Sequence, residues 1–142
     1  FNVFGPRQDP NSEYSAVIPI FVTKMLKGER PTIYGDGRQS RDFTFIDNVV
    51  HGNLAAATAA GAIGRVINVA CGQQFTLLDL VASINAVLDT QIEPQFAPAR
   101  AGDVRASLAD TTLAENLLGY EVQVDFQEGL RRSIDYYRSL SA

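Results

Sequence analysis

The stretch F-N-V-F-G-P-R-Q-D-P at residues 1–10 predicts a β-strand that ends in a loop. Its first four residues have the apolar character of a strand, and the Gly-Pro pair that follows interrupts regular structure. A strand needs a hydrogen-bonded neighbour, and we expect neighbours of this one to lie in chain upstream of Phe1. The stretch therefore predicts that these 142 residues are the later part of a larger α/β fold.

Short strands and amphipathic helices are predicted to alternate along the rest of the chain. Apolar residues recur at helical spacing over residues 17–26, and Gly28 is placed to end that helix. Residues 32–34 and 41–46 have the pattern of short extended segments. The apolar, β-branched run at residues 66–70 predicts a buried strand. Such few and short strands would not form a doubly wound sheet alone.

Polar residues at the starts of apolar patterns predict the remaining helices. Asp47 can cap a helix that ends before Gly61. The sequences at residues 76–79 and 112–115 have the Thr-x-x-acid form of capping boxes, in which two side chains satisfy exposed backbone N–H groups. Asp125 precedes a last helix and places negative charge at the positive end of its dipole. The pattern predicts a mixed α/β chain.

Length and composition indicate a single globular domain over residues 1–142. Hydrophobic residues make up 46% of the chain, and the net charge of −4 is dispersed, which argues against a track for nucleic-acid phosphates. The single cysteine, Cys71, excludes an internal disulfide and fits a reducing cytoplasm. No apolar stretch approaches the ~20 residues that cross a bilayer. No cluster of residues has the spacing of metal ligands. From the charge, the apolar stretches and this spacing together, we expect no nucleic-acid, membrane or metal partner.

The glycines do not form the turn that a nicotinamide cofactor requires. That turn joins a strand to a helix and needs several glycines, because the backbone approaches the pyrophosphate closely. Gly35 and Gly37 form G-x-G, but Ser40 stands where a third glycine belongs. Gly61 and Gly64 form G-x-x-G without a first member. Both pairs are predicted to be ordinary turns.

Five motifs, in order, resemble the C-terminal part of the extended short-chain dehydrogenases. They are N-V-F-G-P-R-Q-D-P-N-S at residues 2–12, Y-S-A-V-I-P at 14–19, I-Y-G-D-G at 33–37, S-R-D at 40–42 and R-A-G-D at 100–103. The resemblance covers nearly the whole chain. It is closest to the NAD-dependent epimerase/dehydratase family, and within it to UDP-glucose and UDP-N-acetylglucosamine 4-epimerases.

The resemblance implies that catalytic residues lie elsewhere. In that family an N-terminal Rossmann domain holds NAD and the catalytic Tyr, Lys and Ser or Thr, with the Tyr four residues before the Lys. The only lysines here, Lys24 and Lys27, follow Ile20 and Thr23 at that spacing. We therefore expect no catalytic residue and no Rossmann domain in this chain. NAD is expected in the full-length parent and not on this segment.

Two arginines carry the expected contact with the substrate. In the family this region clamps a sugar nucleotide, and Arg41 and Arg100 match its diphosphate ligands. Planar guanidinium groups can meet a diphosphate bidentately. The alternative is that Arg41 pairs with Asp42 and Arg100 with Asp103 as exposed ion pairs of small energetic weight. The loop at residues 7–9 is expected near the sugar, without assigned roles.

The resemblance assigns the remaining site residues to the sugar and the nucleoside. Asn2 resembles an amide that reaches the diphosphate or the sugar, and its alternative is a hydrogen bond at a strand end. Asp103 resembles the carboxylate that binds the ribose hydroxyls. Tyr34 resembles the ring that stacks on uracil, and its alternative is a half-buried strand aromatic. Backbone groups around Ala16 and Val17 are expected to distinguish the base.

Two classes of function follow from the resemblance. The first is the UDP-hexose-binding portion of an NAD-dependent nucleotide-sugar 4-epimerase, incomplete as a catalyst on its own. A nucleotide-sugar dehydratase or decarboxylase shares this clamp, although the R-Q-D-P-N-S and S-A-V-I-P sequences favour the epimerases. The second class is a non-catalytic binding or assembly module. Because loss of a partner domain uncovers hydrophobic surface, we expect the chain to self-associate.

Overall fold

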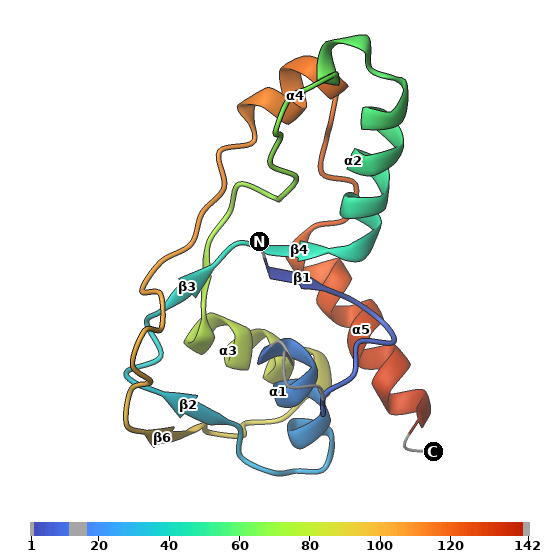
Figure 1. The fold of residues 1–142 in the computed structure, drawn as a ribbon. Helices are drawn as coiled ribbons and strands as arrows, with labels where there is room; N and C mark the ends of the chain where they lie inside the picture. Colours follow the sequence, from blue (N-terminus) through green and yellow to red (C-terminus); the bar gives the residue numbers. More distant parts are fainter. Residues whose placement is uncertain (1, 12–16, 141–142) are drawn as a thin grey trace.

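The structure, a computed structural model, describes residues 2–11 and 17–140 (Figure 1). The described strands form three separate two-stranded sheets, of which two are parallel and one is antiparallel. The pairs are β1 (Asn2–Phe4) with β4 (Phe43–Phe45), β2 (Thr32–Tyr34) with β6 (Gln95–Ala97), and β3 (Ser40–Arg41) with β5 (Phe75–Thr76). The chain is therefore α/β, with few and short strands as its sequence predicts.

The helices lie in two groups on either side of β1 and β4 (Figure 1). One group packs together below these strands and consists of α1 (Val17–Leu26), α3 (Leu77–Leu88) and α5 (Phe126–Leu140). The other lies above them and consists of α2 (Ile46–Thr58), the 3₁₀ turn η1 (Ala60–Ala62) and α4 (Thr112–Leu118). Within residues 2–11 and 17–140, no helix has both the length and the apolar character to cross a bilayer.

The core lies in the lower group and includes an aromatic cluster. Phe126 stacks on Phe75 with ring centroids 4.1 Å apart and on Phe43 at 5.6 Å. Leu80 and Leu130 are fully buried on facing helices. Burial of each such side chain contributes roughly 1.5–3 kcal/mol of hydrophobic free energy. This core holds α1, α3 and α5 together.

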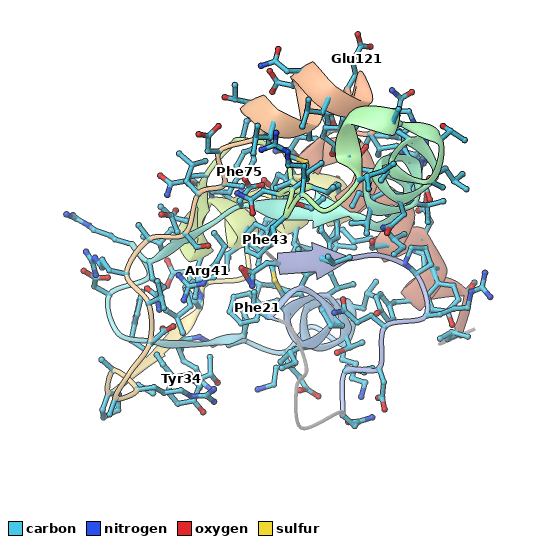
Figure 2. The ribbon with its side chains drawn as sticks, turned by 45° about the horizontal axis from the view of Figure 1, so that its top comes forward. Phe21, Tyr34, Arg41, Phe43, Phe75 and Glu121 are labelled. Atoms are coloured by element: carbon cyan, nitrogen blue, oxygen red, sulfur yellow. The ribbon has the colours of Figure 1, made fainter. Side chains whose placement is uncertain are left out.

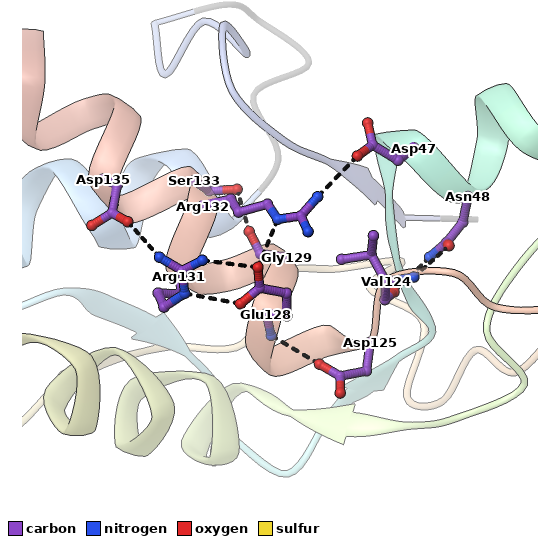
Figure 3. A network of polar contacts seen from close by, with 10 residues as sticks. All are labelled: Asp47, Asn48, Val124, Asp125, Glu128, Gly129, Arg131, Arg132, Ser133 and Asp135. Carbon is purple, nitrogen blue, oxygen red and sulfur yellow. Dashed lines mark hydrogen bonds and ion pairs between the residues drawn. The ribbon is translucent and has the colours of Figure 1, made fainter.

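The end of α5 that meets the core is held by an acid cap and a charged surface network (Figure 3). The Asp125 carboxylate accepts the backbone N–H of Glu128 at 2.8 Å, as its position predicts. The carboxylate of Glu128 in turn accepts hydrogen bonds from Arg131 and Arg132. Gly129 leaves room for Phe45, because a Cβ there would lie 2.7 Å from that ring. Strand β4 and α5 are therefore in close contact.

Two of the predicted helix caps are wrong. Helix α2 begins at Ile46 with Phe45 as its N-cap, so Asp47 lies in the first turn and forms an ion pair with Arg132 instead. Helix α4 takes Thr111 as its N-cap without a side-chain capping bond, so residues 112–115 are not a capping box. The predicted box at residues 76–79 is present at the start of α3.

The predicted buried strand at residues 66–70 is also wrong. This segment is irregular in the structure, and Val66 is 93% exposed while Ala70 is buried. A β-branched run becomes a strand only where another strand offers its hydrogen-bonding edge, and none of the described strands pairs with it. The extended segment at residues 41–46 is divided, because β3 ends at Arg41 and α2 begins at Ile46.

Candidate functional site

A pocket of about 750 Å³ lies between α1, strands β2 and β3, the start of α3 and the turn at residues 100–103. We call it the arginine pocket. Figure 2 shows Tyr34, Arg41 and Phe21 on one side of the molecule, far from Glu121. Among the described residues predicted for the site, every one lines this pocket: Asn2, Val17, Tyr34, Arg41, Arg100 and Asp103. Ala16, the remaining predicted residue, lies outside the described residues.

Tyr34 and Arg100 form one wall of the arginine pocket. Tyr34 stands at the end of β2 with 37% of its surface exposed, which fits both a stacking ring and the half-buried strand aromatic of the alternative. The Arg100 guanidinium carbon lies 3.9 Å from the centroid of its ring. At this distance the cation is attracted by the negative face of the aromatic ring. Arg100 does not form the predicted alternative pair with Asp103 among the ion pairs of the described chain.

Arg41 and Asp103 form a second pair in the lining of the arginine pocket. The Arg41 guanidinium donates one hydrogen bond to Asp103 and a second, at 2.8 Å, to the backbone oxygen of Ser40. The Arg41 side chain is 15% exposed and that of Asp103 is 35% exposed, so the pair is shielded from bulk water on one side only. The alternative in which Arg41 pairs with Asp42 is wrong, because the Asp42 side chain is buried among backbone N–H groups.

One tight turn presents both Arg100 and Asp103. The backbone N–H of Asp103 donates to the oxygen of Arg100 at 3.3 Å, which closes a four-residue turn. Gly102 has φ +81° in the third position of this turn, where a side chain is strained. The turn follows β6, whose parallel pairing with β2 brings it beside Tyr34. Residues some 60 positions apart in sequence, such as Arg41 and Asp103, thereby meet in one pocket.

Asp42 fixes the base of this arrangement. It is fully buried, and its carboxylate accepts three backbone N–H groups, from Cys71 at 3.0 Å, Gly72 at 2.9 Å and Ala109 at 3.3 Å. A buried carboxylate is stable when its oxygens are satisfied in this way. Because Asp42 follows Arg41 directly, it anchors β3 to two segments that are distant in sequence.

Gln39 and Lys24 are among the lining residues of the arginine pocket that sequence reasoning did not assign to the site. Gln39 is 6% exposed and donates its side-chain N–H to the oxygen of Tyr34 at 2.6 Å, which holds the end of β2 in place. Its position between the G-D-G and S-R-D motifs was the available signal. Lys24 also lines the pocket from α1. The pocket therefore combines three cationic side chains with one carboxylate.

The loop at residues 7–9 lies in a neighbouring pocket of about 540 Å³. Gln8 is tied to the strand by a hydrogen bond from its amide to the oxygen of Val3, and its own backbone oxygen accepts the Tyr137 hydroxyl. The two pockets share Ile20 and Lys24. The loop is thus adjacent to the arginine pocket rather than part of it.

The described residues do not fit a nicotinamide cofactor. In residues 2–11 and 17–140, no strand passes through a glycine-rich turn into a helix, since β4 enters α2 at Ile46 and β5 enters α3 at Leu77 directly. Gly35 and Gly37 have positive φ and form a bend between β2 and β3, as predicted. The described part of the chain contains no group of three or more potential metal ligands.

The remaining reactive side chains lie away from the arginine pocket. Burial, with a contribution from nearby Asp42, raises the pKa of the Cys71 thiol, so the thiolate is disfavoured. The ring of His51, on α2, stacks on Tyr120 with centroids 5.8 Å apart. Burial raises the pKa of Tyr120 to about 12, and its hydroxyl donates to the oxygen of Ala70. The ring stacking and the hydroxyl hydrogen bond of Tyr120 both hold α2 and the segment at Ala70 in place.

Comparison with known proteins finds one family model and related sequences that match this chain. Residues 1–70 match the model of the NAD dependent epimerase/dehydratase family. The chain is 38% identical over 140 residues to UDP-glucose 4-epimerase of Mycolicibacterium smegmatis, covering 99% of this chain and 44% of that protein. It spans less than half the length of the curated relatives it matches.

Solved structures show the same relationship in three dimensions. The fold matches UDP-glucose 4-epimerase of Thermotoga maritima, a complex with UDP-glucose, with a TM-score of 0.93 and 38% identity over 99% of this chain and 45% of that one. It also matches UDP-N-acetylglucosamine 4-epimerase of Methanobrevibacter ruminantium, a complex with UDP-N-acetylmuramic acid, with a TM-score of 0.89 and 40% identity, covering 99% of this chain and 44% of that one.

Proposed function

Because this chain belongs to the NAD-dependent epimerase/dehydratase family and matches the C-terminal portion of its structures, we propose that it is the sugar-nucleotide-binding part of a UDP-sugar 4-epimerase. The observation that carries the proposal is the arginine pocket itself. Two guanidinium groups, an open aromatic ring and a carboxylate converge there from distant parts of the sequence. A diphosphate, a base and a ribose need these three kinds of partner.

The diphosphate is assigned to Arg41 and Arg100. Its negative charges leave bulk water on binding, which costs free energy unless cations replace the lost hydration. The two guanidinium groups that line the arginine pocket can each present two parallel N–H donors to the phosphate oxygens. Lys24 adds a third positive charge from α1 and offsets the charge of Asp103.

The nucleoside and the sugar are assigned to the rest of the pocket. The exposed ring of Tyr34 offers a stacking surface for the base, and the Asp103 carboxylate accepts hydrogen bonds from the ribose hydroxyls. Asn2, at the start of β1, lies where its amide can reach the diphosphate or the sugar. The backbone around Ala16 and Val17 is assigned to the edge of the base.

This chain positions its ligand and does not transform it. No tyrosine–lysine pair with the catalytic spacing occurs in the sequence, and the described residues do not fit NAD. In the parent enzyme that we propose, which is cytoplasmic, NAD binding and proton transfer belong to residues other than these 142. The residues of this chain bind the sugar nucleotide and hold its charge, as one domain over residues 1–142.

Calorimetric titration of the chain with UDP, UDP-N-acetylglucosamine and NAD tests the proposal. We expect both uridine nucleotides to bind and NAD not to bind. Arg100→Ala should weaken UDP binding by about 2 kcal/mol, or about 30-fold, because one charged ligand of the diphosphate is lost. Arg132→Ala is the matched control, since Arg132 lies on α5 and pairs with Glu128 of the same helix and with Asp47 of α2. Equal losses in the two variants would refute the assignment.

Self-association is proposed as a separate property of this chain. Helix α2 and the segment after it expose apolar side chains, including Val50 at 50%, Leu54 at 67% and Ile63 at 84%. Contiguous surface of this kind favours contact between copies. Sedimentation at high micromolar concentration should show species larger than a monomer, and Leu54→Glu should shift them toward the monomer. A monomer at all concentrations would contradict the proposal.

A further inference from the structure

The two arginines assigned to the diphosphate are both engaged by the groups assigned to the nucleoside. Arg41 forms an ion pair with Asp103, and Arg100 lies on the ring of Tyr34. Asp103 is the partner assigned to the ribose, and Tyr34 is the partner assigned to the base. Asp103 and Tyr34 are therefore covered by the arginines when no ligand is bound, and the arginines are in turn held away from a diphosphate.

We propose that the arginine pocket discriminates against inorganic pyrophosphate and in favour of nucleoside diphosphates, because the nucleoside releases both arginines for the anion. This inference rests on the proposed function. When the base stacks on Tyr34 it takes the surface that Arg100 covers, and when the ribose hydroxyls bind Asp103 they replace Arg41. Asp103 and Tyr34 are thus specificity-determining residues for the whole ligand.

The electrostatics of the pocket favour this exchange only for the complete ligand. Free pyrophosphate must take Arg41 from Asp103 and leave that carboxylate, 35% exposed, without its cation and beside a second anion. Like charges at short range and an unpaired, partly desolvated carboxylate both cost free energy. The ribose of a nucleoside diphosphate supplies hydroxyl donors to the same carboxylate, so the cost is offset.

The backbone links the two exchanges. Arg100 and Asp103 belong to one turn, closed by the hydrogen bond between them, and the turn is fastened to β2 through Tyr34 and to β3 through Arg41. Hydrogen bonds from the N–H of Gly35 to the oxygen of Ala97 and from the N–H of Ser40 to the oxygen of Arg105 hold both ends of this turn, so a ligand meets the two side chains in fixed relative positions. We therefore expect base and ribose to act together, so that the intact nucleoside diphosphate binds more tightly than its separate parts.

The experiment is a calorimetric titration of the wild-type chain and of Asp103→Asn with inorganic pyrophosphate and with UDP, at fixed ionic strength. Asn cannot hold the Arg41 guanidinium as an ion pair, so Arg41 is released. Exposed or partly exposed ion pairs contribute up to about 1 kcal/mol, so pyrophosphate should bind Asp103→Asn about fivefold more tightly than wild type. UDP should bind it more weakly, because the ribose loses its carboxylate.

Two further variants separate this inference from simpler effects. Asp135→Asn removes the same charge from an exposed ion pair with Arg131 on α5, and it should change neither affinity. Tyr34→Leu frees Arg100 and should also raise pyrophosphate affinity while lowering UDP affinity. Unchanged or weaker pyrophosphate binding in both pocket variants, with wild-type UDP binding intact, overturns the inference. Failure of the wild-type chain to bind UDP would instead reject the proposed function.

Discussion

Replacement of Asp42 by asparagine is expected to destabilise the chain by about 2–4 kcal/mol and to weaken UDP binding with it. Asp42 is fully buried, and its two oxygens accept the N–H groups of Cys71, Gly72 and Ala109. The substitution keeps the shape of the side chain and turns one oxygen into an NH₂ donor. The three backbone N–H groups around it then face a side chain with only one oxygen to accept them.

The magnitude follows from these three hydrogen bonds. If the NH₂ replaces the oxygen that faces Cys71, one backbone N–H loses its acceptor, and in the other orientation Gly72 and Ala109 lose theirs. An unsatisfied buried donor costs about 1–3 kcal/mol, and loss of the negative charge weakens the hydrogen bonds that remain by about 1 kcal/mol. The sum is a large share of the ~5–15 kcal/mol that stabilises a typical domain.

Urea unfolding followed by circular dichroism measures this loss, with Asp47→Asn as the matched control. Asp47 carries an exposed carboxylate that pairs with Arg132 at 3.1 Å, and its substitution should cost less than about 1 kcal/mol. A UDP titration of the folded Asp42→Asn chain should show weaker binding, because β3 carries Arg41. If Asp42→Asn is no less stable than Asp47→Asn, the anchoring role of Asp42 is wrong.

Two other expectations concern the turn and the α5 network. Gly102→Ala should weaken UDP binding about threefold to tenfold in calorimetry, because a side chain at φ +81° costs about 1–2 kcal/mol and distorts the turn. Gly64→Ala is the control, since Gly64 has φ +71° but lies outside the pocket, and it should leave UDP affinity unchanged. Hydrogen bonds from Arg131 and Arg132 lower the pKa of Glu128 from an ordinary 4.5 to about 2, so its stabilising effect is complete above pH 4.5 and is lost as the pH falls toward about 2. In urea unfolding, wild type should therefore exceed Glu128→Gln in stability at pH 6 and lose that advantage near pH 2, and a constant difference across this range would contradict the assignment.

The described residues that the sequence singled out for a site line one pocket, whereas part of the local structure around them differs from the prediction. The sequence singled out Tyr34, Arg41, Arg100 and Asp103 through its motifs, and these residues line the arginine pocket. It missed Gln39 and Lys24, whose contributions depend on which face of a bend or helix meets the pocket. The partners of the site residues were also missed, since Arg41 meets Asp103 rather than its neighbour Asp42.

The sequence by itself determined the α/β class, the bounds of β2, the helix at residues 17–26 and the capping box at residues 76–79. These features depend on side-chain spacing and on hydrogen bonds between residues close in the chain. Only the tertiary structure decided that residues 66–70 remain irregular and that Arg41 lies against Asp103. A strand needs a partner edge, and a buried or paired charge needs a counterpart brought from far away in sequence. Local patterns carry neither kind of information.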